Sequence, residues 1–372
     1  MFWAKEPYNS MKRKVLIITN HRKDRSPGQR FRFEQYLDFL TSNGYEFDFS
    51  NLFDEEDDRK LYSKGNLLDK FRIYRKCVKI RKEDLKRIDN YDIVFIFREA
   101  LMTGSTRFEK AFSKSKAKLI FDFDDAIWIP NVSDANKRFE FLKDSSKTGK
   151  IIKLCDMVFA GNKYLANYAA NFNDNVKIIP TTIDTEEYLK QSVVKNDKIC
   201  IGWSGSITTI QHFEYAIPFL TEVKKRFGEL VEFRVIGDSS YINEELSIKG
   251  LAWNKQTEIR DLSTFDIGIM PLPDDEWANG KCGLKGLQYM ALEIPTIMSP
   301  VGVNSEIIND GVNGFLASDI KEWVVKLTSL IESEQLRKEI GINARKTVEF
   351  RYSVKVNEQL YLKWFNKLLS IN

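Results

Sequence analysis

Residues 279–315 read NGKCGLKGLQYMALEIPTIMSPVGVNSEIINDGVNGF, and this stretch decides the fold expected for the second half of the chain. Gly280 and Gly283 allow the backbone to approach a ligand, and Lys281 and Lys285 lie four residues apart. Apolar residues at helical spacing follow, and then a short strand pattern. A helix start with amide and ammonium groups suits a diphosphate, whereas a core helix with solvated lysines is the alternative interpretation.

The order of residues within this stretch narrows the choice. It closely resembles the donor-binding segment of GT-B glycosyltransferases of family 4 in the succession Lys285, QYMA at 288–291, IPT at 294–296, SPVGVNSE at 299–306 and DGVNGF at 310–315. The resemblance implies two Rossmann-like domains that face each other across a cleft, with a C-terminal helix that crosses back to the first domain. It also implies a nucleotide-diphosphate sugar as co-substrate, no other cofactor and no metal.

Composition predicts a soluble globular protein and excludes several classes of protein. The chain has 372 residues, enough for two domains, with 43% apolar and 30% charged residues. No long apolar run or signal-peptide core is present, so we expect a cytoplasmic protein. Two histidines and four scattered cysteines leave little material for a multi-histidine metal site, a Ser-His-Asp triad or a disulfide framework. A net charge of +4 does not indicate nucleic-acid binding.

Strand and helix patterns alternate along both halves of the chain, which predicts doubly wound parallel sheets. Strands are expected at 15–19, 45–49, 93–97, 119–123, 157–160 and 176–179, and then at 199–203, 231–236, 246–250, 267–270 and 296–299. The predicted organisation is a tail at 1–10, an acceptor domain at 11–190, a nucleotide-sugar domain at 191–352 and a returning C-terminal helix at 353–372. Val356, Leu360, Trp364 and Leu368 define the expected apolar face of that helix.

The predicted donor site combines two loops of the second half. Gly202-Trp203-Ser204-Gly205-Ser206 follows its first strand, where backbone amides and hydroxyls can bind phosphate, although a plain turn is the alternative. The family commonly has an arginine and a lysine here and two glutamates near the lysine helix. This chain has Ser204 and Gln211, and Gly280 and Gln288, at those places. The expected donor-binding residues are Gly202, Ser204, Gly205, Ser206, Trp253, Lys281, Gly283, Lys285, Gln288, Val303, Asn304 and Glu306.

Asp122, Asp124 and Asp125 end a strand of the first half, where a parallel sheet places its ligands. Carboxylates this close repel one another unless a cation, an arginine or a proton lies between them, and Asp122 is expected to face away from Asp125. Helix capping and a magnesium site are the alternatives. The resemblance implies that Asp124 and Asp125 contact the sugar, so we predict Asp124, Asp125 and Lys285 as catalytic residues.

Arginine side chains at the same edge of the first half can bind a phosphate or a sugar carboxylate. The expected acceptor-side residues are Gly28, Arg30, Arg32, Arg98 and Glu99, and exposed salt bridges are the alternative for each arginine.

A basic segment covers residues 59–87, with Phe71, Tyr74, Val78 and Leu85 on or near one helical face. It is either a solvated helix docked on the first domain or a surface that binds anionic lipid, and we favour the lipid interpretation. The enzyme would then sit peripherally on the inner face of the cell membrane.

The prediction as a whole is a glycosyltransferase that moves a sugar, with retention of configuration, to a hydroxyl of a glycan or lipid-linked acceptor in cell-surface polysaccharide synthesis. The alternatives are a non-catalytic partner subunit of another transferase and a GT-B-like sugar-nucleotide epimerase.

Overall fold

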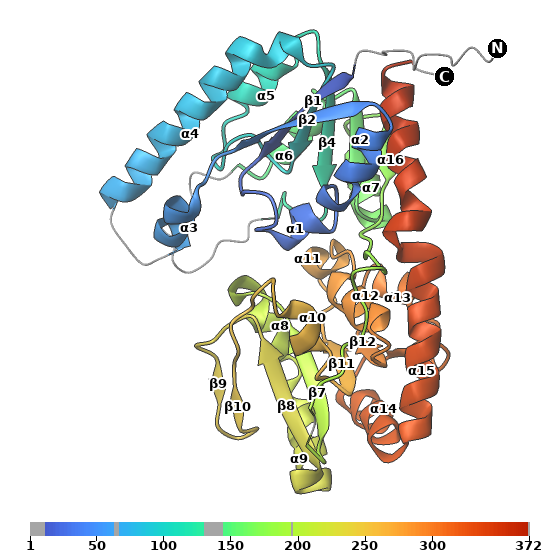
Figure 1. Ribbon diagram of the computed structural model, residues 1–372. Helices are drawn as coiled ribbons and strands as arrows, with labels where there is room; N and C mark the ends of the chain where they lie inside the picture. The colour runs from blue at the N-terminus through green and yellow to red at the C-terminus, as the bar shows by residue number, and fades with distance from the viewer. Residues whose placement is uncertain (1–11, 63–66, 130–143, 195, 371–372) are drawn as a thin grey trace, which may run out of the picture.

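The computed structural model describes residues 12–62, 67–129, 144–194 and 196–370. The tail predicted at 1–10 lies outside these residues. Two α/β units lie one above the other, and a long C-terminal helix runs along one side of both (Figure 1). The predicted architecture of two doubly wound parallel-sheet units is confirmed.

The first unit is built on a six-stranded parallel sheet in the described residues, with the order β2-β1-β3-β4-β5-β6. Its strands are β1 (Arg13–Thr19), β2 (Tyr45–Asn51), β3 (Ile93–Phe97), β4 (Lys118–Phe123), β5 (Met157–Ala160) and β6 (Val176–Ile178). The inner strands are continuous apolar runs and are buried on both faces, as helices on both sides require. Separate clusters of apolar side chains fill the two sides.

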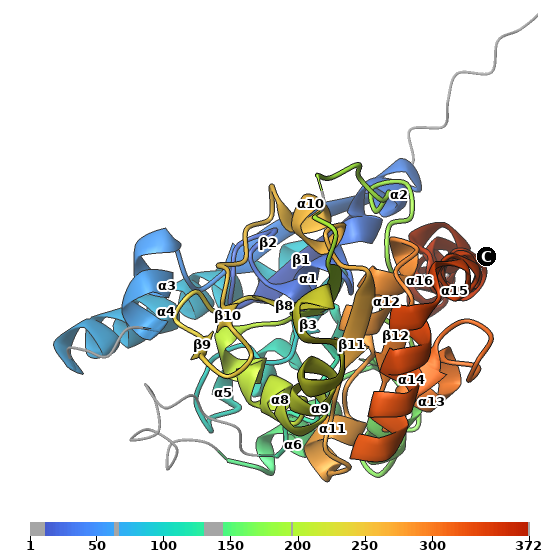
Figure 2. The same ribbon diagram turned by 90° about the horizontal axis from the view of Figure 1, so that it is seen from below.

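The helices of the first unit are short apart from one. They are α1 (Pro27–Arg30), α2 (Leu37–Ser42), α3 (Glu55–Tyr62), α4 (Leu67–Arg87), α5 (Arg107–Phe112), α6 (Lys147–Ile152) and α7 (Lys163–Ala170). The long helix α4 lies at the outer edge of the unit, on the side away from the C-terminal helix (Figure 1 and Figure 2).

Helix α4 docks only partly through the predicted face, of which Val78 and Leu85 pack against the core of the first unit. Its buried residues are Ile73, Cys77, Arg81 and Asp84. Arg81 is fully enclosed because its guanidinium donates to the carbonyls of Thr19, Ser50 and Ala100 and pairs with Asp84. Phe71 and Tyr74 lie outside this face and are 61% and 40% exposed.

The second unit has a five-stranded sheet in the described residues, with the order β13-β12-β11-β7-β8. Its strands are β7 (Ile199–Ser204), β8 (Val231–Ile236), β11 (Ile267–Met270), β12 (Thr296–Met298) and β13 (Phe315–Leu316), and all pair in parallel. The strand predicted at 246–250 does not join this sheet. It is β10 (Ile248–Lys249), which pairs antiparallel with β9 (Ile242–Asn243) in a hairpin.

The helices of the second unit are α8 (Ile210–Glu214), α9 (Ile217–Phe227), α10 (Glu258–Leu262), α11 (Glu276–Asn279), α12 (Leu284–Ala291), α13 (Asn304–Ile307), α14 (Ile320–Glu332) and α15 (Glu334–Thr347). Helix α12 is the lysine helix predicted from the sequence, and its residues 286–291 are buried. It begins at Gly283, whose φ of 72° is left-handed and therefore suits glycine.

The C-terminal helix α16 (Val354–Leu368) returns to the first unit, as the family resemblance implied. The Tyr361 hydroxyl donates to the Arg32 carbonyl at 2.6 Å, and the Tyr45 hydroxyl donates to Asn366 at 2.7 Å. The predicted apolar face is wrong by one residue. The buried side chains are Asn357, Tyr361 and Phe365, whereas Val356 is 53% exposed and Leu360, Trp364 and Leu368 are partly buried.

Candidate functional site

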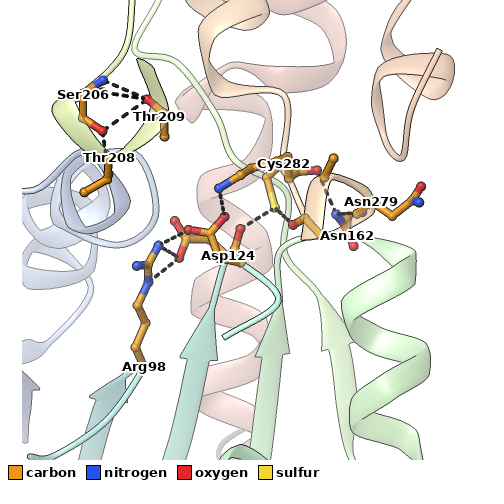
Figure 3. A network of polar contacts seen from close by, with 12 residues as sticks. Arg98, Asp124, Asn162, Ser206, Thr208, Thr209, Asn279 and Cys282 are labelled. Atoms are coloured by element: carbon orange, nitrogen blue, oxygen red, sulfur yellow. Dashed lines mark hydrogen bonds and ion pairs between the residues drawn. The ribbon is translucent and has the colours of Figure 1, made fainter. Parts of the chain in front are cut away.

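The two units meet where the carboxyl end of β4 faces the turn between α11 and α12. A Cβ added at Gly280 would lie 2.7 Å from the Cβ of Ala126, so the backbones approach closely here. The Cys282 thiol donates to the Asp124 carbonyl at 3.3 Å, and the Asn162 amide donates to the Lys281 carbonyl at 3.0 Å (Figure 3). Residues from strands β4 and β5 thus hold the turn against the first unit, at the sheet edge where open α/β sheets place ligands.

Four charged groups form the centre of this interface. Arg98 pairs with Asp124 and Asp125, each at 2.6 Å, and Lys281 pairs with Asp125 at 2.7 Å across the two units. Burial would raise the pKa of Asp125, but Lys281 and Arg98 hold that pKa below its ordinary value. The cation expected between the carboxylates is therefore supplied by protein side chains.

Arg98 adopts an uncommon backbone conformation, with φ at 62°. Non-glycine residues in the left-handed region cost about 1–3 kcal/mol and persist where the surroundings hold them. The side chain of Arg98 is directed at both carboxylates, which provides that support. Gly28 packs on the same group, because a Cβ there would lie 2.8 Å from Asp124 Oδ2 and 2.9 Å from Phe97.

Asp122 belongs to a different cluster, as its expected orientation away from Asp125 required. It forms a buried ion pair with Arg32, and both side chains are 0% exposed. Arg32 also donates to the Ile179 carbonyl. Arg32, expected on the acceptor side, thus lies within the core of the first unit and contacts no open surface.

Arg98 and Lys281 each pair with a carboxylate, whereas Lys285 has no carboxylate within ion-pair distance among the described residues. It lies in the first turn of α12, and its ammonium is 5.5 Å from the ring centroid of Trp203. Burial, followed by repulsion from Lys281, lowers the pKa of Lys285 to about 8, against the attraction of Asp125. An ammonium held this way favours an incoming anion.

The predicted phosphate loop divides into buried and accessible parts. Gly202 and Ser204 lie in β7, and the Ser204 hydroxyl and amide both bond to the Tyr289 hydroxyl, at 2.9 and 2.7 Å. Gly205 packs on Trp203. Ser206 is exposed, and its hydroxyl bonds with Thr208 at 3.0 Å; Thr209 completes a capping box with it (Figure 3). Neither threonine was predicted, although the S-x-x-T spacing could have identified Thr209.

A second interdomain cluster surrounds Glu258, which the sequence did not single out. The Arg30 guanidinium donates to Glu258 at 2.8 Å, and the Trp253 indole donates to it at 2.8 Å. Gln288 donates to Glu258 at 3.2 Å and to the Tyr188 hydroxyl at 3.0 Å. The structure thus brings Arg30, Trp253 and Gln288 together around the buried Glu258 carboxylate. Their hydrogen bonds are to Glu258 and not to Lys285.

The other predicted residues lie in different places. Val303 and the buried Asn304 face Gly283 at the start of α12, where a Cβ on Gly283 would lie 3.4 and 3.6 Å from them. The Asn304 side-chain oxygen has no hydrogen-bond partner among the described residues. Glu306 is exposed. Glu99 pairs with Lys147 at 2.7 Å, an ion pair within the first unit.

Other features of the described chain lie apart from this interface. A cavity of about 390 Å³, lined in part by Asp92, Lys118 and Leu368, lies at the amino ends of β3 and β4, the wrong sheet edge for a ligand site of this fold. Within the described residues, no three His, Cys, Asp or Glu side chains are grouped to hold a metal ion. None of the helices there is long and apolar enough to cross a bilayer.

Comparison with known proteins agrees with this geometry. Residues 198–333 match the family model described as glycosyl transferases group 1. An uncharacterized glycosyltransferase of Methanocaldococcus jannaschii is 23% identical over 68% of this chain and 69% of its own length. The capsular polysaccharide biosynthesis glycosyltransferase CapM of Staphylococcus aureus is 26% identical over 43% of this chain and 44% of its own.

Solved structures share the fold over nearly the whole chain. A glycosyltransferase from Rickettsia africae superposes with a TM-score of 0.65 at 16% identity, covering 97% of this chain and 99% of that one. Anabaena HepE, solved in complex with UDP and glucose, gives a TM-score of 0.63 at 13% identity, covering 95% of this chain and 100% of that one.

Proposed function

We propose that this chain is a GT-B glycosyltransferase of the group 1 type, which transfers a sugar from a nucleotide-diphosphate sugar to a hydroxyl of a glycan or lipid-linked acceptor. The transfer takes place at the interface where Lys285 of the second domain faces Asp124 and Asp125 of the first. The observation that carries this proposal is Lys285, a partly buried ammonium at a helix start with no carboxylate of its own.

The donor's diphosphate binds at the start of α12. Lys285 supplies positive charge, and the amide groups of the first turn supply aligned donors. As the glycosidic bond breaks, negative charge grows on the leaving phosphate, so these groups stabilise the transition state more than the bound substrate. The exposed Ser206 hydroxyl, just after the carboxyl end of β7, contributes a further hydrogen-bond donor.

Lys281 has a double role in this scheme. In the structure it pairs with Asp125 and joins the two domains. A diphosphate competes with Asp125 for the Lys281 ammonium, so donor binding and the interdomain contact are coupled. Under this proposal, Lys281 binds the diphosphate when the donor is bound and pairs with Asp125 when it is not.

The lowered pKa of Asp125 supports retention of configuration. A general base works best when its pKa lies near the operating pH, but Arg98 and Lys281 lower the pKa of Asp125. An ionised carboxylate that is a weak base is suited to stabilise an oxocarbenium-like sugar. The departing phosphate then accepts the acceptor's proton on the same face of the sugar. Measuring the anomeric proton coupling of the product tests this step, and an inverted product would contradict it.

The name of one relative and the surface of α4 support a proposal about the pathway. CapM is named for capsular polysaccharide biosynthesis, and we assign this chain to cell-surface polysaccharide assembly on the same grounds. Phe71 and Tyr74 are exposed on α4 beside the exposed basic residues Arg72, Arg75 and Lys79. Aromatic rings among cations suit an anionic bilayer surface, which would bring the enzyme to a lipid-linked acceptor.

The experiment that tests the function is a panel of nucleotide-diphosphate sugars screened by thermal shift on the purified chain. Donors that stabilise the fold are then incubated with the chain, with and without candidate lipid-linked acceptors. We expect stabilisation by one class of donor and release of the nucleoside diphosphate from it. If no donor in the panel either stabilises the chain or is turned over, the proposed function is wrong.

A further inference from the structure

His212, in helix α8, is a buried histidine whose place in the fold has no structural explanation of its own. Its side chain is 4% exposed. Nδ1 has no hydrogen-bond partner among the described residues. Leaving a buried polar atom unpaired costs about 1–3 kcal/mol, so such atoms are rare and require an explanation.

The ring lies beside the donor side of the interdomain site. The next residue, Phe213, packs on Trp203 with 5.7 Å between the ring centroids. The Lys285 ammonium lies 5.5 Å from the centroid of the same Trp203 ring. Lys285 and Lys281 are near enough to lower the pKa of His212, after the larger effect of its burial. The large majority of buried side-chain polar atoms have a hydrogen-bond partner, which Nδ1 of His212 lacks among the described residues.

We propose that His212 is a ligand of the donor's diphosphate, which it binds together with Lys285. The proposal rests on the proposed function, because it takes the diphosphate to bind at Lys285. A phosphate oxygen within reach of the imidazole supplies the hydrogen-bond partner that Nδ1 otherwise lacks among the described residues. The site then holds its anion with one ring and one ammonium from two different helices, α8 and α12.

The charges around the ring predict a proton linked to binding. Burial, and then Lys285 and Lys281, lower the pKa of His212 to about 4, whereas Asp275 and Asp125 act in the opposite direction. Without a diphosphate beside it, the ring is therefore neutral near pH 7. A diphosphate adds negative charge beside the ring and offsets the two lysines, so the pKa of His212 rises in the complex and the ring takes up a proton as the ligand binds.

The test is calorimetric titration of the full chain with inorganic pyrophosphate, a probe that does not depend on the unidentified base or sugar. Titrations at about pH 6 in two buffers of different ionisation enthalpy give the affinity and the number of protons taken up. His212→Leu keeps the side-chain volume without a polar atom, and His212→Gln keeps a hydrogen-bond donor that cannot titrate. We expect His212→Leu to weaken pyrophosphate binding about tenfold, and His212→Gln to retain most of the affinity. Both variants should take up fewer protons than the wild type.

Several results would overturn the proposal. They are pyrophosphate affinity within twofold of the wild type in a folded His212→Leu variant, and proton uptake by His212→Gln equal to that of the wild type. The second result decides the question even if His212→Leu fails to fold. A wild type that binds pyrophosphate with the expected His212 dependence but transfers no sugar would remove the proposed function and leave this inference standing.

Discussion

The surroundings of Lys285 predict a pH dependence of donor binding that arises from this one residue. The pKa of about 8 means that the ammonium is charged below that pH and loses its charge as the pH rises through it. Diphosphate binding needs the charged form, so the donor KM should rise by about tenfold per pH unit above about pH 8. The measurement is a pH series of donor KM on the wild type, with Lys285→Arg as the matched variant. The arginine stays charged, so its profile should stay flat, and a flat profile in the wild type would contradict the assignment.

Gly28 sets a steric limit on Asp124. An added methyl would meet Asp124 Oδ2 at 2.8 Å and Phe97 at 2.9 Å, so Gly28→Ala must displace the carboxylate. A displacement on the order of 1 Å near the reacting atoms can cost about 10²-fold in rate. We expect a loss of this size in kcat, with little change in thermal stability, measured by steady-state kinetics and calorimetry. Unchanged kcat would separate Asp124 from the reaction.

Individual residues also show where prediction from sequence ended. Asp124, Asp125 and Lys281 could be placed at one interface because each follows a strand or opens a helix at the ligand edge. Glu258 could not be found, since its bond to Arg30 joins residues 228 positions apart and nothing in the local pattern marks it. Arg32 was predicted on the acceptor side because its ion pair with the buried Asp122 joins residues 90 positions apart, which no local pattern marks.

At the scale of elements, the helices that were predicted well are those with one clear apolar stripe. Helix α16 has two adjacent stripes, and the buried one contains Asn357 with Tyr361 and Phe365, because contacts with Tyr36 and Tyr45 decide between them. The same holds for α4, where the buried Arg81 defines the docking face through its carbonyl partners. Hydrophobic periodicity does not identify the polar residues on the face through which a helix docks.

The exposed aromatic residues of α4 give a prediction about membrane binding. The double variant Phe71→Ser/Tyr74→Ser should lower binding to vesicles of anionic phospholipid severalfold, because the rings insert among the headgroups while the lysines and arginines attract them. Co-sedimentation with vesicles measures this. Phe350→Ser is the matched control, since Phe350 is 75% exposed but lies outside α4. Equal loss in the control, or no loss in the double variant, would contradict a lipid-binding role for α4.

At the scale of the whole molecule, the two parallel sheets were predictable because most of their inner strands are largely apolar runs. The hairpin of β9 and β10 was not, since a strand of two residues carries almost no pattern. The interface between the domains is a tertiary property. Its close approach at Gly280 and Ala126 and its Lys281–Asp125 pair depend on how the two folded units meet.

The most direct test of the account is sugar transfer by the wild type and by Lys285→Ala, assayed side by side with the donor identified in the panel and with excess chelator present. The exposed Lys321→Ala in α14 serves as the control. The account predicts full transfer by the wild type and the control, because protein cations bind the diphosphate, and a loss of about 10²–10³-fold in kcat/KM for folded Lys285→Ala. Near-normal transfer by Lys285→Ala, or transfer that stops when the chelator is added, would contradict it.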